Sequence, residues 1–302
     1  MKVLLASSSA LANPVLEYLQ NSTLELIGVI TSPDVPRGRG REISENELAI
    51  SARAAGLPLF KPNTHDEIRD ILVSTEADLV VTLAYGRLIR ARELELPRYG
   101  WLNIHFSILP RWRGAAPAQR ALEAGDEKTG VTVFRLDAGL DTGPLFATSE
   151  YVVQGDESSS ILLERLAKLS VAPLEEAIEK ISTNIAPTPQ SDEGVSLAPK
   201  LTKGEGRISW SDSNVAIERK LRAFNPWPTA WTMLGDTRIS ILSARSIEGN
   251  FQPGVIFDEG KLIVGCGRGA LEVLSLKPEG KREMSSLEWM RGARLGPGDS
   301  FQ

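Results

Sequence analysis

Three polar side chains alternate along a short apolar run in the first half of the chain. They are Asn103, His105 and Ser107, and His105 is one of only two histidines among 302 residues. Successive side chains of a β-strand point to opposite faces, so we expect all three on one face of a strand. An imidazole moves protons near neutral pH, and a side-chain amide donates to an oxygen that becomes negative. These residue types at this spacing indicate acyl-type transfer.

A carboxylate that acts with His105 is expected from the glycine-rich run Leu136–Gly143, which carries Asp137 and Asp141. The glycines let the backbone turn sharply there. Both features also have a purely structural interpretation. A strand histidine is often a core residue with satisfied ring nitrogens, and a turn aspartate often only caps its own backbone. The residues alone do not decide which of the two aspartates acts with His105.

The elements that would position these side chains follow from hydrophobic periodicity. Roughly the first 180 residues alternate short apolar runs with helical patterns, which is typical of a parallel α/β sheet. Strands are predicted at Lys2–Ala6, Leu24–Thr31, Leu57–Phe60, Ala77–Leu83, Trp101–Ile104 and Val131–Leu136. Helices are predicted at Leu11–Gln20, Glu45–Ala55, Thr64–Ser74 and Leu88–Leu94, with one longer helix at Ser158–Ile181. Asn103 and His105 then lie at a strand end, where α/β sheets bind ligands.

The composition changes after the predicted long helix. Residues 184–203 contain three prolines and no apolar periodicity, as expected of a linker. Short apolar runs separated by turns follow, and they predict a small antiparallel barrel. We therefore expect a catalytic domain at 1–186, a linker at 187–206 and a barrel domain at 207–302. The barrel strands are predicted at Thr237–Leu242, Gly254–Phe257, Leu262–Val264 and Ala270–Leu276, with helices at Val215–Phe224 and Ser285–Gly292.

Composition excludes several classes of function. The single cysteine rules out an intrachain disulfide framework, and no histidine or cysteine spacing fits a metal site, so we expect a metal-free cytoplasmic protein. No apolar run is long enough to span a membrane. The net charge of −5 argues against nucleic-acid binding by the whole surface. One basic island, with Arg37, Arg39 and Arg41 between glycines, can bind phosphates locally, although such a run is often a solvated loop.

Several ordered motifs carry a resemblance to a known family. Asn103-Ile-His-Phe-Ser-Ile-Leu-Pro110, together with Gly130-Val-Thr-Val133 and Asp137-Ala-Gly-Leu-Asp-Thr-Gly143, resembles the 10-formyltetrahydrofolate-dependent formyltransferases. The resemblance covers nearly the whole chain, and it implies a Rossmann-like parallel-sheet α/β domain followed by a small OB-like β-barrel. Further matching runs are Thr31–Gly40, Ala84–Gly86, Arg222–Pro228 and Lys277–Lys281.

The resemblance implies a role for particular residues. It makes Asn103, His105 and Asp141 the catalytic trio and 10-formyltetrahydrofolate the formyl donor, with no metal. The folate pocket would be formed by Ala84, Tyr85, Gly86, Ser107, Ile108, Leu109 and Pro110. The chain departs from the family pattern at Phe106 and Ile108, which remain apolar, and at Ala6–Ser9, where the family tends to have Gly-Thr-Pro.

The resemblance also implies the acceptor, which is the amino group of methionine on initiator methionyl-tRNA, formylated for translation initiation. In this case Arg37, Arg39 and Arg41 would bind the tRNA, with Arg39 at the key position, and we expect a monomer. A sugar-nucleotide or ribonucleotide amine is the alternative acceptor, because those relatives share the same trio. An RNA-binding protein with an inactive transferase fold would have lost the trio. A nicotinamide dehydrogenase is disfavoured because no Gly-x-Gly-x-x-Gly follows the first predicted strand.

Overall fold

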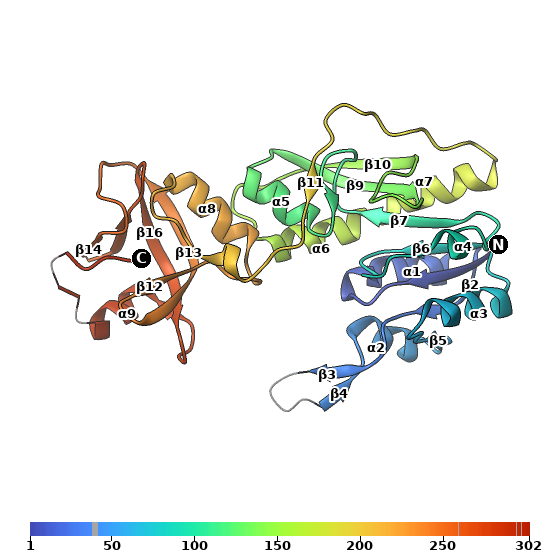
Figure 1. Cartoon of the computed structure of the whole chain (residues 1–302), viewed down its shortest axis with the longest axis horizontal. Coiled ribbons are helices and arrows are strands. Elements are labelled where there is room, and N and C mark those ends of the chain that lie inside the picture. The colour runs from blue at the N-terminus through green and yellow to red at the C-terminus, as the bar shows by residue number, and fades with distance from the viewer. Residues whose placement is uncertain (38–41, 259, 294, 297) are drawn as a thin grey trace. The chain divides into compact units, whose positions relative to one another are not determined.

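The computed structural model describes residues 1–37, 42–258, 260–293, 295–296 and 298–302. Contacts divide the chain into two compact units, which Figure 1 traces from the N- to the C-terminus. The first unit consists of Met1–Pro117, Lys128–Val152 and Leu163–Ala198. The second consists of Ala118–Glu127, Val153–Leu162 and Pro199–Gln302.

A seven-stranded sheet forms the centre of the first unit, in the order β10-β9-β7-β6-β1-β2-β5. Its five strands from β7 to β5 are parallel, whereas β9 pairs antiparallel with both β7 and β10. The parallel α/β fold class predicted for this part of the chain is confirmed. The strands are β1 (Lys2–Ala6), β2 (Glu25–Ile30), β5 (Leu59–Phe60), β6 (Leu79–Thr82), β7 (Trp101–His105), β9 (Lys128–Arg135) and β10 (Leu145–Val152).

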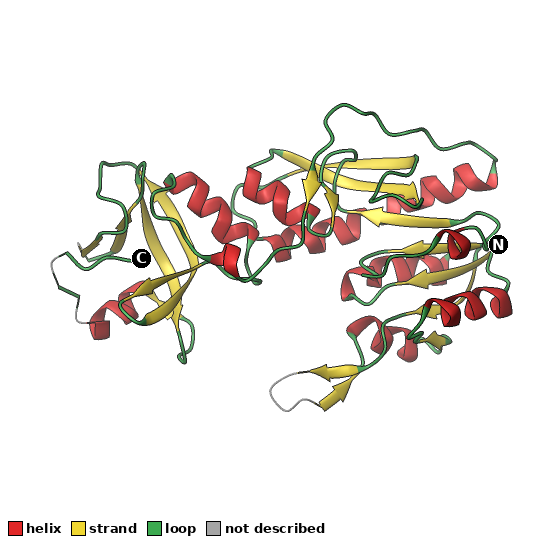
Figure 2. Cartoon of the chain, in the orientation of Figure 1, coloured by secondary structure: helices red, strands yellow, loops and turns green. Residues whose placement is uncertain are grey.

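Helices alternate with the strands of this sheet, as Figure 2 shows. One face of the sheet, with Leu4 and Val80, packs against Ile68 and Leu72 of α3. The buried core on this face holds the strands in position, since apolar burial is the main stabilising contribution. The helices are α1 (Asn13–Asn21), α2 (Glu47–Ala54), α3 (His65–Thr75), α4 (Ala91–Leu94), α5 (Pro117–Ala124), α6 (Ser159–Leu169) and α7 (Val171–Ser182), and a 3-10 turn, η1, spans Ala10–Ala12.

The single long helix predicted at Ser158–Ile181 is wrong, because two helices, α6 and α7, occupy this stretch and meet at Ser170. Pro173 lies in the first turn of α7, where a missing N–H is tolerated because no carbonyl of the same helix needs it. The apolar periodicity continues through both helices, so the break leaves no mark on the hydrophobic pattern.

Two short strand pairs complete the first unit. β3 (Val35–Arg37) pairs antiparallel with β4 (Glu42–Ser44), and β8 (Arg113–Gly114) pairs parallel with β11 (Leu197–Ala198). β11 lies inside the segment 187–206 that the sequence indicates as a linker. That segment is therefore shared between the units, with residues 187–198 in the first and the 3-10 turn η2 (Gly204–Gly206) in the second.

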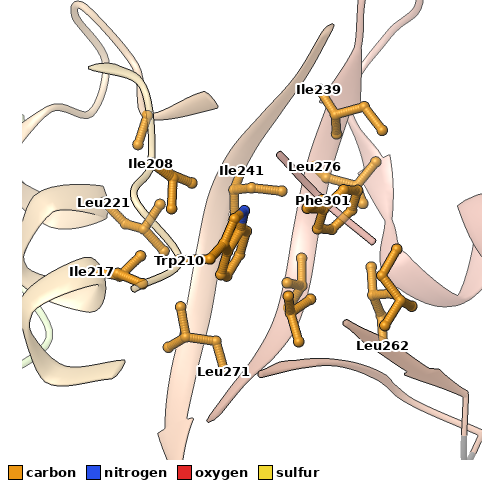
Figure 3. Packing of buried hydrophobic residues seen from close by; sticks show 14 of the residues in the cluster. Ile208, Trp210, Ile217, Leu221, Ile239, Ile241, Leu262, Leu271, Leu276 and Phe301 are labelled. Carbon is orange, nitrogen blue, oxygen red and sulfur yellow. The ribbon is translucent and has the colours of Figure 1, made fainter. Parts of the chain in front are cut away.

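An antiparallel sheet forms the second unit, in the order β12-β13-β16-β15-β14, with β17 paired to β16. Its core is shown in Figure 3, where Trp210 is surrounded by apolar side chains from helix and strands. Trp210 stacks on Phe301 with 5.7 Å between ring centroids, and its indole N–H donates to the Thr232 hydroxyl at 2.9 Å. The elements are β12 (Trp231–Leu234), β13 (Thr237–Ile247), β14 (Ile256–Asp258), β15 (Leu262–Gly265), β16 (Ala270–Pro278), β17 (Met284–Ser285), α8 (Asn214–Ala223) and α9 (Ser286–Ala293).

No helix within residues 1–37, 42–258, 260–293, 295–296 and 298–302 is long and apolar enough to cross a membrane.

Candidate active site

Two of the three alternating polar residues lie on strand β7. Asn103 pairs with Phe134 of β9, and His105, the last residue of β7, pairs with Thr132. Ser107 follows the end of the strand, so the alternation no longer places its side chain. It is fully buried and its hydroxyl donates to the Arg111 carbonyl at 2.6 Å. Asn103 and His105 therefore share a face as predicted, whereas the Ser107 hydroxyl is used inside its own loop.

His105 is almost fully buried, with two different partners for its ring nitrogens. Nε2 lies 2.8 Å from the Trp112 carbonyl oxygen. A carbonyl only accepts hydrogen bonds, so Nε2 carries the proton. Nδ1 faces the Asp141 carboxylate, with 3.7 Å between Nδ1 and Oδ2. In the neutral ring Nδ1 then holds a lone pair and is ready to accept a proton.

The charge state of His105 is set by burial, which is opposed by two contacts of the ring. Burial lowers the pKa of His105, and this effect outweighs both the Asp141 charge and the hydrogen bond to Trp112, which raise it. Desolvation disfavours the charged imidazolium. With a pKa below its usual value, the ring is mainly neutral near pH 7 in the ligand-free protein.

The two candidate aspartates have different surroundings. Asp141 accepts the Gly114 N–H at 2.7 Å through Oδ2, the same oxygen that faces His105. Asp137 is exposed and accepts from the Gly139 N–H at 2.9 Å and the Thr142 hydroxyl at 2.7 Å. Asp137 thus shapes its own loop, and Asp141 is the carboxylate that lies beside the imidazole.

The Asn103 side chain is oriented by its neighbour on β6. Thr82 pairs with Asn103 across the sheet, and its hydroxyl donates to the Asn103 Oδ1 at 2.6 Å. Because the amide oxygen is occupied, the NH₂ group is the part of Asn103 that remains as a donor. A proton-accepting imidazole, a carboxylate that stabilises its charged form, and an amide donor for a developing oxyanion together suit acyl transfer to an amine.

The remaining residues expected around a folate follow the ends of β6 and β7. The carboxyl ends of these parallel neighbours meet at one edge of the sheet, which brings residues 84–86 and 107–110 to the same side. Ala84 and Gly86 have φ of 48° and 75°, and Tyr85 is buried, which raises the pKa of its hydroxyl. The loop after β7 is tied to β9, because the Leu109 N–H donates to the Thr132 hydroxyl at 3.2 Å.

The basic island is the part of the expected site that the structure does not describe. Arg39 and Arg41 lie outside the described residues, and only the backbone of Arg37, at the end of β3, lies within them. Their role stays a prediction.

The sequence analysis did not predict several groups that form hydrogen bonds within the site. The Trp112 carbonyl is a backbone group, which leaves no residue-type signal. Gly114 does leave one, because a Cβ there would lie 2.6 Å from the Ala198 carbonyl oxygen, and its φ of 128° also favours glycine. Gln190, in the expected linker, donates to the Asp141 carbonyl at 2.8 Å.

Replacing Asp141 with asparagine should lower the pKa of His105 further, because the carboxylate charge opposes the effect of burial. NMR titration of the ring signals measures this directly. The chain has only two histidines, so a His65→Gln background leaves a single histidine to follow. Asp137→Asn is the matched control and should leave the pKa of His105 unchanged. An unchanged or raised value in Asp141→Asn would show that this carboxylate is not coupled to the imidazole.

Comparison with known proteins identifies the family to which the chain is similar. Residues 1–178 match the family described as Formyl transferase, and residues 200–294 match Formyl transferase, C-terminal domain. The methionyl-tRNA formyltransferase of Acidothermus cellulolyticus is 40% identical over 325 residues, with 100% of each chain covered. That of Renibacterium salmoninarum is 38% identical over 305 residues, with 100% of this chain and 99% of the relative covered.

Solved structures share the fold at low sequence identity. HypX from Aquifex aeolicus in complex with tetrahydrofolic acid matches with a TM-score of 0.66 and 16% identity, over 99% of this chain and 48% of HypX. WlaRD, a sugar 3N-formyltransferase, matches with a TM-score of 0.68 and 17% identity, over 93% of this chain and 99% of WlaRD. The full-length curated relatives and the two domain matches carry the assignment: the chain belongs to the formyl transferase family.

Proposed function

We propose that this chain is a cytoplasmic methionyl-tRNA formyltransferase, which transfers the formyl group of 10-formyltetrahydrofolate to the methionine amino group of initiator methionyl-tRNA. The product is N-formylmethionyl-tRNA for translation initiation. The observation that carries this proposal is full-length similarity, at about 40% identity, to a relative of that name. The cluster of Asn103, His105 and Asp141 supports it, because it supplies the groups that formyl transfer to an amine requires.

The edge of the sheet beyond β6 and β7 fits the folate. The peptide N–H groups of residues 84–86 make no hydrogen bond to the described part of the chain, so they are available to a ligand. Leu109 and Tyr85 are buried apolar residues of the two segments that follow β6 and β7. Apolar walls with a few convergent polar groups are typical of sites for flat heterocyclic ligands. These residues, with Ser107, Ile108 and Pro110, would hold the folate.

The reaction uses each member of the trio in a different way. When bound, 10-formyltetrahydrofolate supplies the formyl group on its N10 nitrogen. The Asn103 NH₂ group donates to the formyl oxygen as negative charge develops there. His105 Nδ1 accepts a proton from the methionine amine as the new carbon–nitrogen bond forms, and it returns the proton to the nitrogen that departs. Asp141 stabilises the transient imidazolium, and the Trp112 carbonyl keeps the ring oriented.

The alternative acceptor, a sugar-nucleotide or ribonucleotide amine, has weaker support. The similarity to WlaRD, at 17% identity, carries the fold alone. The first eight curated relatives are 37–40% identical and all have the name methionyl-tRNA formyltransferase. A tRNA acceptor also gives a role to the basic island at Arg37, Arg39 and Arg41, which would bind phosphates of this polyanion in an otherwise acidic monomer.

A formyl-transfer assay that compares three acceptors tests the proposed function. Initiator methionyl-tRNA should be formylated much faster than elongator methionyl-tRNA, and an amino-sugar nucleotide should not be formylated. The comparison holds enzyme and 10-formyltetrahydrofolate constant and measures initial rates. Preferential formylation of the amino-sugar nucleotide would overturn the proposal in favour of the alternative.

Removal of either proposed catalytic side chain from β7 should abolish most of the turnover. We expect His105→Ala and Asn103→Ala each to reduce kcat by roughly 100-fold or more, because each loses a group that acts as charge develops in the transition state. Single-turnover formylation with the acceptor in excess measures the chemical step. Circular dichroism checks that each variant is folded, and near-normal turnover in a folded variant would refute the role of that residue.

Arg39→Ala should weaken the use of charged tRNA without affecting folate binding. A lost phosphate or base contact costs roughly 1–3 kcal/mol, and the defect should shrink as salt concentration increases, because the wild type has one more salt-sensitive phosphate contact to lose. The measurement is kcat/KM for initiator methionyl-tRNA across a salt series, with folate affinity measured in parallel. Arg53→Ala is a control for the loss of one positive charge, because Arg53 lies on α2 and is paired with Glu45. Equal kcat/KM for wild type and Arg39→Ala at every salt concentration would exclude a role for this loop.

A further inference from the structure

The segment 187–198 lies against both loops that contact His105. The first of these loops, residues 106–116, provides the Trp112 carbonyl for Nε2. The second, residues 136–143, provides the Asp141 carboxylate that faces Nδ1. All three segments belong to the first unit. The part of the chain that reads as a linker in the sequence is therefore packed beside the proposed catalytic groups.

Both residues that contact the imidazole have an unfavourable backbone conformation. Trp112 has a φ of 64° and Asp141 a φ of 52°, in the left-handed region that favours glycine. Residues with side chains keep this conformation only where surrounding contacts hold them in it, and such positions cluster at active sites. The contacts that hold Trp112 and Asp141 in this conformation are therefore part of what builds the site.

The Trp112 side of the site is held by Ser196 and strand β11. The Ser196 hydroxyl accepts from the Trp112 N–H at 2.9 Å, and the Ser196 carbonyl accepts from the Arg113 N–H, also at 2.9 Å. Next to them, Ala198 pairs with Gly114, whose N–H donates to the Asp141 carboxylate. The segment thus fixes the backbone of the loop that orients His105.

On the Asp141 side of the site, the backbone of the loop is bound by the side-chain amide of Gln190. The Gln190 Nε2 donates to the carbonyl oxygens of Asp141 and Gly143, at 2.8 Å each. Its Oε1 accepts from Nε and NH2 of the Arg113 guanidinium, at 3.1 and 2.7 Å. One amide therefore uses both of its N–H groups and its oxygen to join the 136–143 loop to the 106–116 loop.

We propose that Gln190 is a positioning residue, which holds Asp141 in its left-handed conformation and so keeps the carboxylate beside His105. The inference rests on the proposed role of Asp141 in formyl transfer. Gln190 contacts the Asp141 carbonyl and not the carboxylate, so it acts through Asp141 and does not touch the reacting groups. A small displacement of a catalytic group reduces the rate strongly, which gives a residue outside the reacting groups a measurable effect.

The test uses Gln190→Met, which keeps the length of the side chain, removes the amide and adds no charge. We expect kcat to fall roughly 10- to 100-fold with little change in KM for the acceptor, since binding surfaces are untouched. We also expect the pKa of His105, measured by NMR in the His65→Gln background, to fall towards its value in Asp141→Asn. Asp192→Ala, which truncates an exposed side chain two residues away, is the matched control and should behave as wild type.

A double-mutant cycle separates positioning from general stabilisation. In the Asp141→Asn background, Gln190→Met should cause little further loss of kcat and little further change in the pKa of His105, because the carboxylate it positions is gone. An equal loss in both backgrounds, or an unchanged pKa of His105 in Gln190→Met, would overturn the inference.

A second variant and a measurement without substrate keep the result of this experiment interpretable. If Gln190→Met does not fold, Gln190→Asn tests the same point, because it keeps the amide but is one methylene shorter and cannot reach both loops. The titration needs no substrate, so it reports on the coupling of Gln190, Asp141 and His105 even if the chain fails to formylate methionyl-tRNA. A failure of the proposed function is thereby distinguished from a failure of this inference.

Discussion

The two ring nitrogens of His105 have different roles, since Nε2 is a hydrogen-bond donor and Nδ1 is not, and the rest of the site is arranged around this difference. Nε2 donates to the Trp112 carbonyl, which fixes both the tautomer and the orientation of the ring. Nδ1 is left with a lone pair and faces a carboxylate 3.7 Å away. Because the ring is almost fully buried, the neutral form predominates until a proton arrives from the substrate amine. Asp141 then has its largest effect on the transient charge.

This arrangement needs a rigid support, and the fold supplies it from two directions. Strand β7 lies inside the sheet between β6 and β9, where Thr82 orients Asn103 and the Thr132 hydroxyl donates to the Ser107 carbonyl. The parts of the two loops that face His105, around Trp112 and Asp141, are bound by residues 187–198. The conformational energy stored at Trp112 and Asp141 is thus offset by hydrogen bonds from a segment far away in sequence.

Much of this organisation was predictable from residue patterns. The period-2 alternation correctly placed Asn103 and His105 on one face, and the order of apolar runs correctly indicated a parallel sheet. The choice between Asp137 and Asp141 was not decidable from spacing, because both lie in the same glycine-rich turn. Their hydrogen bonds distinguish them. The same alternation wrongly placed Ser107 on this face, because the strand ends at His105 and the alternation does not continue beyond it.

Other features could not be predicted from the sequence, for physical reasons. A backbone group such as the Trp112 carbonyl carries no residue-type signal. Gln190 lies in a stretch whose prolines and lack of periodicity indicate a linker, yet its contacts are set by tertiary structure. The direction of the pKa change at His105 depends on the balance of burial against the Asp141 charge, and burial is known only once the chain is folded.

The central claim is that His105 rests as a neutral imidazole with its proton on Nε2. Nitrogen-15 NMR of the ring, in the His65→Gln background at pH 7 without substrate, tests this most directly, since protonated and unprotonated ring nitrogens resonate far apart. The account predicts a protonated Nε2 and an unprotonated Nδ1. A proton on Nδ1, alone or together with one on Nε2, would contradict it.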